Sequence, residues 1–533
     1  LSAISKLTTT YYSKCGTRKG DIMITKESII WAIQFLQKHS DGDLFPKILE
    51  LNAILDKAEL LADELCRINL SQIEMGAHRR FIVPKDGVSY RQATQLDLQD
   101  SIIFTSVIYQ YGSLIESRRL PSDIVFSYRF SPDMEHGFYA DRNTWNTFWR
   151  TAYRKSLPGK TILYCDIADF YNQIYHHTIE NQLIESGFPN QETKWIIRLL
   201  GSTTAGVSRG IPVGPHPAHL LAEASMIPID NSLKAQGIDF IRYVDDIIVF
   251  CESEKDAQLK LARIATTLDK QQRLILQRHK TKIYSTIEFK SLCSDMIEDR
   301  PISLQEDTIL KLINKYSNGD PYRIVFYGDI SEQDWNSITD EIISGIINDY
   351  LNKSTIEYDR LRWFYRRLTQ IGHPGGVDVS LANIEKLTPC FANVCMYLGS
   401  VQKIPVDKWV SIGDQLLRLM ETEIVQSNEY FRLLLISLFT KNQYINHFAS
   451  LVHDYQKSEA FIRREIILSA KQNHAVDWLR EQKESFINME SWQQMAYIFS
   501  ISDLPLEERK YFINRFKYSR VLMSVLAKWA KES

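Results

Sequence analysis

The sequence predicts an α+β protein of 533 residues, in which a small antiparallel sheet with surrounding helices precedes a long all-helical region. Short apolar runs rich in β-branched and aromatic residues, separated by polar turns, indicate strands in the first part of the chain. In the last part, about nine segments instead carry apolar residues at helical spacing. We therefore expect an N-terminal arm with helices (1–75), a mixed α/β region (76–300) and a helical region (301–533).

Composition and charge narrow the class of protein. Hydrophobic residues make up 44% of the chain and charged residues 24%, as in ordinary globular proteins. There is no run of eighteen apolar residues and no signal-peptide core, so we expect a soluble intracellular protein without a membrane partner. The formal net charge is −2, whereas proteins that grip long nucleic acids are commonly basic. Any positively charged surface that binds nucleic acid must therefore be confined to one part of the molecule.

The first third of the chain combines an arm, helices and a hairpin. The first twenty residues are polar and lack apolar periodicity, which is typical of an arm. Helices are expected from Thr25, which can act as an N-cap, and after Pro46, where the apolar residues of 51–65 form one stripe. Residues 78–91 then predict a strand, a Lys-Asp-Gly turn and a second strand, with cations at both ends. Taken alone, this segment is also compatible with an ordinary solvated hairpin.

Two later segments place aspartates at strand ends. An apolar strand over 161–166 ends at Asp166, and a hairpin over 240–250 has Asp245 and Asp246 at its turn. Two adjacent carboxylates repel each other by about 1 kcal/mol even in water, so a cation is expected to neutralise them. Mg²⁺ prefers carboxylate oxygens and usually completes its shell with substrate phosphates. An Asp-rich hairpin turn without a metal is the alternative for the aspartate pair alone.

Taken in order, these segments resemble the fingers and palm of reverse transcriptases. The resemblance covers about residues 78–293 and is carried by the hairpin, by Asp166 followed by Phe170-Tyr171, by Gly-Ile-Pro-Val-Gly-Pro and Leu-Leu-Ala-Glu within 210–223, by Tyr243-Val244-Asp245-Asp246, and by Leu276–Ile283. It implies nucleotidyl transfer assisted by two Mg²⁺ ions, for which Mn²⁺ can substitute. Asp166, Asp245 and Asp246 are then catalytic; Asp166, Asp245 and the backbone carbonyl of Ile167 hold the metals, and Asp246 has a secondary role.

The same resemblance assigns nucleotide-binding residues. Lys85 and Arg91 would hold the triphosphate, since Arg can bind phosphate oxygens in pairs and Lys acts as a mobile point charge. Tyr171 would lie under the sugar and exclude a 2′-hydroxyl, although packing in the core is a compatible role. Gly214 lets the backbone approach the nucleotide, and Lys280 lies near the leaving pyrophosphate. The chain departs from the family pattern where Val213 replaces Gln, Ala218 replaces Ser and Glu223 replaces Asn.

The remaining segments are expected to be mainly helical. Residues 287–293 could add a last strand to the sheet, and 255–272 read as an amphipathic helix. Single helices are expected at 100–114, 144–154, 335–351, 407–420, 430–439, 461–471 and 511–530. In the last region the spacing of about twenty residues suggests helix pairs stacked as a HEAT-like α-solenoid, with an unrelated helical bundle as the alternative.

Among reverse transcriptases, the chain looks most similar to the abortive-infection, phage-defence group. The motif within 210–223 and the long helical region in place of a thumb carry this resemblance. It implies a prokaryotic, cytoplasmic homo-oligomer, a trimer or hexamer, that makes single-stranded DNA from dNTPs without a template and starts from a protein hydroxyl. Tyr11 and Tyr12 in the arm are candidate primers, although they could simply be exposed side chains. A reverse transcriptase that copies a bound RNA, as in retrons, remains an alternative. So does an inactive palm used as a scaffold, although the intact aspartates argue against it.

Overall fold

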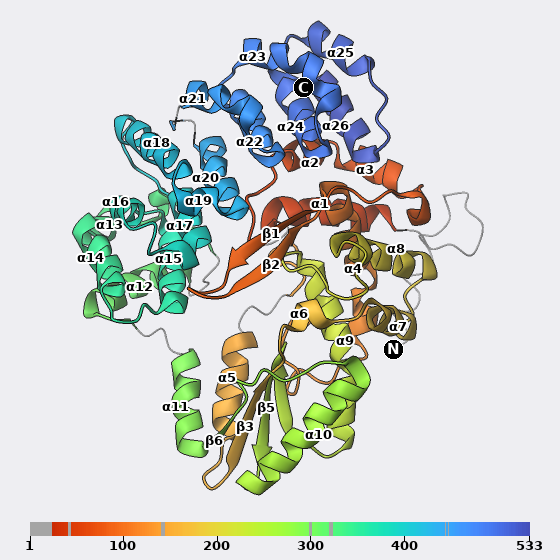
Figure 1. Ribbon diagram of the computed structural model, residues 1–533, viewed down its shortest axis with the longest axis vertical. Coiled ribbons are helices and arrows are strands. Elements are labelled where there is room, and N and C mark those ends of the chain that lie inside the picture. The colour runs from red at the N-terminus through yellow and green to blue at the C-terminus, as the bar shows by residue number, and fades with distance from the viewer. Residues whose placement is uncertain are drawn as a thin grey trace.

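The computed structural model describes residues 24–40, 44–139, 144–297, 301–318, 323–442, 444–445 and 447–533. A mixed α/β part forms the lower and middle regions of the molecule in Figure 1, and the C-terminal helices form an arc along its left side and top. Within the described residues, no helix combines the length and the apolar character that a membrane span needs.

The lower part is built on a four-stranded antiparallel sheet with the strand order β4-β5-β3-β6. Its strands are β3 (Thr161–Asp166), β4 (Phe240–Tyr243), β5 (Asp246–Cys251) and β6 (Lys282–Ser285). Alternate residues face opposite sides, as the pleat requires. Ile162 and Ile248 pack with the aromatic residues of α5 (Thr144–Lys155) and with α11 (Thr286–Ile297), whereas Leu163 and Val249 belong to the larger core that includes α10 (Glu254–Gln272). Both faces of the sheet are thus covered by helices.

The middle part consists of helices and a hairpin. The hairpin pairs β1 (Arg79–Pro84) with β2 (Tyr90–Gln95). The helices are α1 (Lys26–His39), α2 (Leu51–Asp56), α3 (Ala58–Leu65), α4 (Leu98–Glu116), α6 (Phe170–Gln173), α7 (His176–Ser186), α8 (Asn190–Thr203) and α9 (His216–Ala235). Helix α9 packs against α4, α7 and α10, so it joins this part to the sheet below.

Several expected elements differ in the structure. The single stripe over 51–65 is divided into α2 and α3 at Lys57, which leaves helical geometry with a φ of −117°. The expected last strand at 287–293 is wrong, because these residues lie in α11, and β6 ends just before it. Phe289 and Cys293 lie four residues apart and share one helix face against the aromatic cluster of α5. Burial at helical spacing, rather than local strand propensity, decides this segment.

The C-terminal region is entirely helical in its described residues. Its helices are α12 (Leu304–Ser317), α13 (Glu332–Ser337), α14 (Asp340–Leu351), α15 (Tyr358–Ile371), α16 (Val377–Ala382), α17 (Phe391–Leu398), α18 (Val406–Met420), α19 (Glu423–Gln426), α20 (Glu429–Lys441), α21 (Phe448–His453), α22 (Ala460–Gln472), α23 (Val476–Glu481), α24 (Ser491–Ser500), α25 (Leu506–Asn514) and α26 (Val521–Glu532). The expected helix at 335–351 is interrupted where the Thr339 side chain caps α14. The one expected at 511–530 is divided into α25 and α26.

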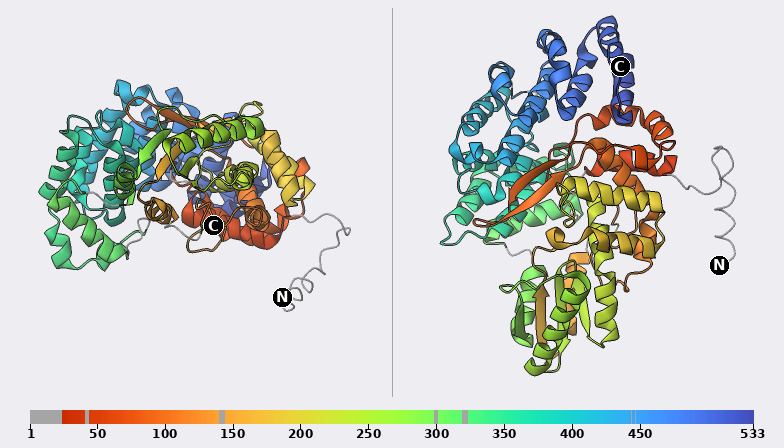
Figure 2. Two further views of the ribbon diagram at one scale, coloured as in Figure 1. Left: turned by 90° about the horizontal axis from the view of Figure 1, so that it is seen from below. Right: turned by 45° about the vertical axis from the view of Figure 1, so that its right-hand side comes forward.

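These helices stack in succession and return to the start of the chain. Helices α15, α17, α20, α22, α24 and α26 each pack on the next, and α26 packs on α2 and α3. Figures 1 and 2 show the resulting arc, which passes beside the hairpin and ends above the N-terminal helices. A buried ion pair between Arg464 and Glu50 (2.7 Å) joins the two regions, and Tyr430 contacts Phe81 of the hairpin. The arc therefore covers one face of β1.

Candidate active site

Three carboxylates meet at one end of the four-stranded sheet. Strand β3 ends at Asp166 and β5 begins at Asp246, and these two residues are paired across the ladder. Asp245 lies in the tight turn between β4 and β5, and its carbonyl accepts a hydrogen bond from the Ile167 N–H at 3.2 Å. The antiparallel register therefore gathers, at one place, residues that are about eighty positions apart in the chain.

Burial and repulsion from neighbouring carboxylates both disfavour the ionised forms of Asp245 and Asp246. Burial, together with the charge of Asp166, raises the pKa of Asp245 to about 6. Burial, together with the charge of Asp245, raises the pKa of Asp246 to about 7. A cation that enters the cluster relieves the repulsion and favours the ionised forms.

Two further side chains contact the carboxylates. The Lys280 Nζ lies 2.6 Å from Asp166 Oδ2, and the Tyr164 hydroxyl donates a hydrogen bond to Asp246 Oδ1 at 2.6 Å. Burial lowers the pKa of Lys280, but the bond to Asp166 and the charges of the aspartates outweigh burial and raise it overall. Lys280 therefore stays cationic and neutralises part of the cluster.

The donor set fits a hard divalent cation such as Mg²⁺. In the part of the chain that the structure describes, no three His, Cys, Asp or Glu side chains form a ready-made metal cage. Mg²⁺ does not need one, because it is usually held by one or two carboxylates, water and substrate phosphates. Asp166 and Asp245, with the backbone carbonyl of Ile167, are the groups that would hold the ion.

Tyr171 lies on α6, five residues beyond Asp166, and its hydroxyl is fixed. The Tyr171 Oη is 2.6 Å from His219 Nδ1 on α9. The His219 ring in turn stacks on Tyr128, with centroids 4.1 Å apart and an interplanar angle of 4°. Burial raises the pKa of Tyr171 well above its usual value, so the phenol stays neutral. The aromatic ring predicted to lie under the sugar is thus hydrogen-bonded to a stacked pair of rings and meets His219 edge-on.

The glycine-rich loop before α9 is attached to the hairpin. The Thr94 N–H of β2 donates to the Val213 carbonyl at 2.8 Å. Gly214 has a φ of +128°, and a Cβ there would lie 3.0 Å from the Thr94 carbonyl oxygen. Both observations explain a glycine at this position, since other residues rarely adopt this φ and the space is tight. Val213 itself lines the neighbouring cavity.

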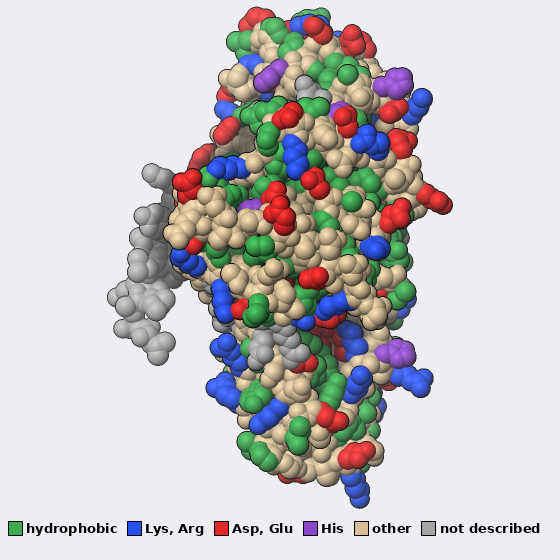
Figure 3. All heavy atoms as spheres, turned by 90° about the vertical axis from the view of Figure 1, so that its left-hand side faces the viewer, with side chains coloured by type: hydrophobic (Ala, Val, Ile, Leu, Met, Phe, Trp, Pro, Cys, Tyr) green, Lys and Arg blue, Asp and Glu red, His purple; other side chains and the backbone are tan. Residues whose placement is uncertain are grey.

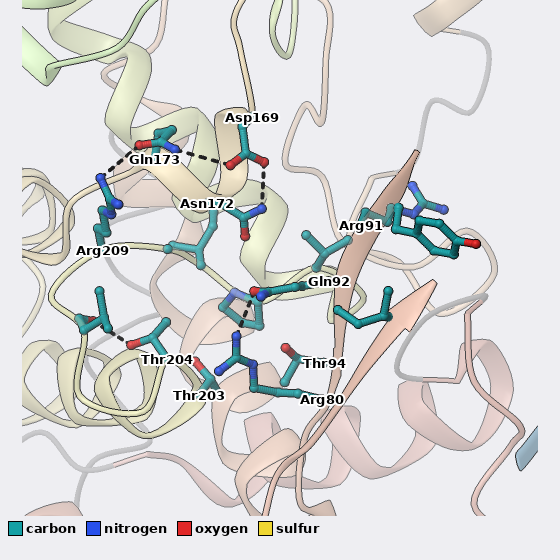
Figure 4. Close-up of a pocket in the computed structure, with 17 residues that line it drawn as sticks. Arg80, Arg91, Gln92, Thr94, Asp169, Asn172, Gln173, Thr203, Thr204 and Arg209 are labelled. Carbon is teal, nitrogen blue, oxygen red and sulfur yellow. Dashed lines mark hydrogen bonds between the residues drawn. The ribbon is translucent and has the colours of Figure 1, made fainter. Parts of the chain in front are cut away.

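That cavity, of about 470 Å³, lies between the hairpin, α6 and the glycine-rich loop (Figure 4). Arg80 and Arg209 contribute positive charge to its wall and Asp169 contributes negative charge; Arg91 is also among the residues that line it. Arg80 Nη2 donates to Gln92 Oε1 at 2.8 Å, and Arg209 Nη1 to Gln173 Oε1 at 3.3 Å. The charge and the amides make the cavity suitable for a polar, anionic ligand.

The hairpin residues divide between its two faces. Arg80 and Gln92 lie on the face toward the cavity, and by the alternation of the strands Arg91 shares the opposite face with Val83. Figure 4 places Arg91 across the cavity from Arg209. Lys85 lies exposed in the turn, where its carbonyl accepts a hydrogen bond from Arg362 of α15. The positive charge of Lys85 acts against the larger effects of burial and Asp166 that raise the pKa of Asp245, so Lys85 is close enough to influence the carboxylate cluster.

Some residues of the site were not among those predicted from the sequence. Arg80 lies within the predicted hairpin but was given no role, and Gln92 and Arg209 lie just outside the motifs. The polar residues that alternate with Phe81 and Ala93 were the sequence signal for a second functional face of the hairpin. The candidate primers Tyr11 and Tyr12 lie outside the described residues.

Comparisons with known proteins bear on this site. Residues 121–309 match the family model for reverse transcriptase (RNA-dependent DNA polymerase), so a domain of this type is present and includes all three aspartates. A comparison with curated proteins finds no match. Among solved structures, the apo telomerase of Candida tropicalis is similar at 10% identity with a TM-score of 0.30, covering 77% of this chain and 70% of that chain. The telomerase of Candida albicans, in complex with a TWJ fragment of telomeric RNA, is similar at 11% identity with a TM-score of 0.30, covering 71% and 70%.

Proposed function

We propose that this chain is a phage-defence DNA polymerase of reverse-transcriptase type, which adds dNTPs to a growing strand. The observation that carries the proposal is the pairing of Asp166 with Asp246 across β3 and β5, with Asp245 in the adjoining turn. Bound Mg²⁺ supplies activation of the attacking oxygen and stabilisation of the leaving group. Asp166 and Asp245 would hold the metals, and Asp246, which accepts a hydrogen bond from Tyr164, would support them.

The other residues of the site bind and orient the nucleotide. Lys85 and Arg91 attract the triphosphate from the hairpin, and Lys280 can move from Asp166 to the pyrophosphate as charge develops there. Tyr171, fixed by His219, limits the space beneath the sugar. The glycine-rich loop brings the backbone of Gly214 close to the nucleotide.

We also propose that synthesis needs no template and begins on a protein hydroxyl. Val213 provides no amide for aligning a template base with the nucleotide. Acidic and basic side chains are interspersed over the helical part of the face drawn in Figure 3, in keeping with the net charge of −2. A covalent anchor would retain a strand that such a surface grips weakly, because phosphate contacts supply most non-specific affinity. Tyr11 and Tyr12 remain the candidate primers.

A homo-oligomer, a trimer or hexamer, built through HEAT-like C-terminal repeats completes this proposal. The stacking of every second helix from α15 to α26, interrupted only by the extra helices α18 and α19, supports a repeat architecture. Light scattering of the full chain and of a chain ending at Ile297 tests the role of this region in assembly. A soluble shortened chain with an unchanged number of subunits contradicts it.

A second candidate function is RNA-templated synthesis on a bound RNA. The cavity between the hairpin and the glycine-rich loop favours it, since Arg80 and Arg209 could hold the phosphates of a template strand.

One experiment separates the two candidates. The purified protein is incubated with Mg²⁺ and each radiolabelled dNTP, with and without a primer–template, and then boiled and resolved by denaturing electrophoresis. Label that remains on the polypeptide and is released by protease supports protein priming. Label found only on free DNA, and only when primer–template is added, supports the templated candidate.

A further inference from the structure

The turn that carries Asp245 contains an unusual backbone conformation. Val244 has a φ of +54°, in the left-handed region. For a β-branched residue this conformation is a genuine outlier, and such strain persists only where the surroundings enforce it. Because Asp245 follows directly, the conformation of Val244 sets the direction in which the chain presents the carboxylate.

Both hydrogen-bonding groups of Val244 are held by buried side chains. The Val244 N–H donates to Ser127 Oγ at 2.9 Å, and the Val244 carbonyl accepts from Arg242 Nη1 at 2.7 Å. Ser127 and Arg242 are both 0% exposed. Residues 124–126 run parallel to β4 and exchange backbone hydrogen bonds with Arg242, which aligns Ser127 with Val244.

A buried network of charges holds these two side chains in turn. Arg242 binds Asp230 through two hydrogen bonds, of 2.8 and 2.6 Å, and donates to Glu223 Oε2 at 2.9 Å. Glu223 also accepts from the Ser127 hydroxyl at 2.6 Å and from Arg119 at 2.7 Å. Two arginines thus face two acids, so the network carries no uncompensated charge. Glu223, which stands where the family pattern has Asn, is the acceptor that connects Ser127, Arg119 and Arg242.

We propose that Ser127 and Arg242, joined by Glu223, are positioning residues that hold Val244 in its left-handed conformation and thereby aim Asp245 at the metal-binding cluster. This inference rests on the proposed function, because it concerns a ligand of the same site. We call these three residues, Ser127, Arg242 and Glu223, the Val244 clamp. Without the clamp, Val244 relaxes toward the commoner β or α conformations, and the Asp245 carboxylate spends less time in its metal-binding orientation.

The test compares Ser127→Ala with Ser225→Ala in the full-length protein. Ser225 is a suitable control because it is also buried and, among the described residues, its hydroxyl bonds only the Ala222 carbonyl of its own helix, at 2.7 Å. The probe is Mn²⁺, whose binding is followed by electron paramagnetic resonance and calorimetry, with thermal melting measured in parallel. Loss of one hydrogen bond to the turn should weaken Mn²⁺ binding about fivefold in Ser127→Ala relative to Ser225→Ala. The melting temperature should fall further in Ser127→Ala than in Ser225→Ala, because the Val244 N–H and Glu223 each lose a partner, so the affinities are compared well below both transitions.

A second substitution, Val244→Gly, distinguishes a specific effect of Ser127 on the Val244 conformation from a general loss of stability. Glycine adopts positive φ without cost, so Val244→Gly should make the turn less dependent on the clamp. The Ser127→Ala defect in Mn²⁺ affinity should therefore be smaller in the Val244→Gly background, as a double-mutant cycle measures. Unchanged affinity in Ser127→Ala, or an equal defect in both backgrounds, overturns the inference. If Ser127→Ala does not fold, Ser127→Cys makes the same test, because a thiol fills the space but bonds weakly.

One control separates failure of this inference from failure of the proposed function. Asp245→Asn should lose both Mn²⁺ affinity and nucleotide incorporation. If it retains them, the proposed site is wrong. If Asp245→Asn loses Mn²⁺ affinity and nucleotide incorporation while Ser127→Ala binds Mn²⁺ as well as Ser225→Ala does, the proposed site stands. Only the positioning role of Ser127 is then refuted.

Discussion

The Tyr171 hydroxyl lies 2.6 Å from His219 Nδ1, and this contact holds the aromatic ring that follows Asp166 in one orientation. The ring cannot rotate away without losing that bond, and His219 is itself stacked on Tyr128. A side chain held by a hydrogen bond to a stacked partner can exclude a substituent by its shape, which a mobile ring cannot do as well. Sugar selection by Tyr171 follows as a prediction.

Replacing Tyr171 with Val should open space beneath the sugar and allow ribonucleotides. We expect the ratio of kcat/KM for dNTP to that for rNTP to fall by at least about tenfold, as judged from single-group discrimination in other binding pockets. Tyr171→Phe keeps the ring and loses only the bond to His219, so its ratio should lie between those of the two proteins. An unchanged ratio in Tyr171→Val would assign the residue to core packing alone.

Asp245→Asn should abolish nucleotide incorporation with folding intact. The substitution keeps the shape but removes the charge that would hold a metal, and a loss of at least about a thousandfold is expected. The melting temperature in the absence of metal should not fall, because repulsion from Asp166 is relieved. Asp239→Asn, an exposed aspartate just before β4, is the matched control and should remain active. Activity of Asp245→Asn near that of the wild type would refute the site.

The effect of Mg²⁺ on stability should depend on pH. Folding raises the pKa of Asp245 to about 6 and of Asp246 to about 7, from an ordinary value of 3.8. Between the unfolded-state pKa of 3.8 and the folded-state values of about 6 and 7, the folded protein binds more protons than the unfolded chain. The metal-free protein therefore loses stability as the pH rises from about 4 to about 7. Mg²⁺ needs the ionised carboxylates, so its stabilising effect should be greater at about pH 8 than at about pH 5.5.

Thermal melting with and without Mg²⁺ at the two pH values measures this difference. In Asp245→Asn the shift caused by Mg²⁺ should be small at both. Equal shifts at both pH values in the wild type would show that the ion binds elsewhere.

Arg464→Ala should destabilise the whole protein, because it leaves Glu50 buried without its partner. Glu50 is 0% exposed and receives two hydrogen bonds from Arg464, of 2.9 and 2.7 Å. Removing one partner of such a pair costs roughly 3–5 kcal/mol, measured by denaturant unfolding. Arg464 also bonds the buried Glu465, so all three charges must be removed together: Arg464→Met with Glu50→Gln and Glu465→Gln should restore much of the loss. Arg480→Ala, at an exposed pair with Glu508, should leave stability almost unchanged. A small loss of unfolding free energy in Arg464→Ala would mean that this contact between the helical arc and the N-terminal helices contributes little to stability.

The local parts of the site could be predicted from sequence because their signals are short in range. The strand that ends at Asp166 and the hairpin over 240–250 follow from apolar runs beside polar turns, and both occur in the structure. Helices with a clear stripe, such as α18, α20 and α22, begin and end within two residues of their expected limits. The positions at which one helix ends and the next begins were predicted less well. Thr339 divides one expected helix because a capping hydrogen bond competes with the continuing apolar stripe.

Sequence alone therefore determined which residues form the strands beside the three aspartates and which carry the motifs that resemble reverse transcriptases, because these depend on neighbours along the chain. Only the tertiary structure decided what surrounds them. Ser127 meets Val244 across 117 positions and Arg464 meets Glu50 across 414, and no local periodicity encodes such partners. Strand register, helix packing and the matching of buried charges select them, since a buried polar group must find a partner wherever the fold supplies one.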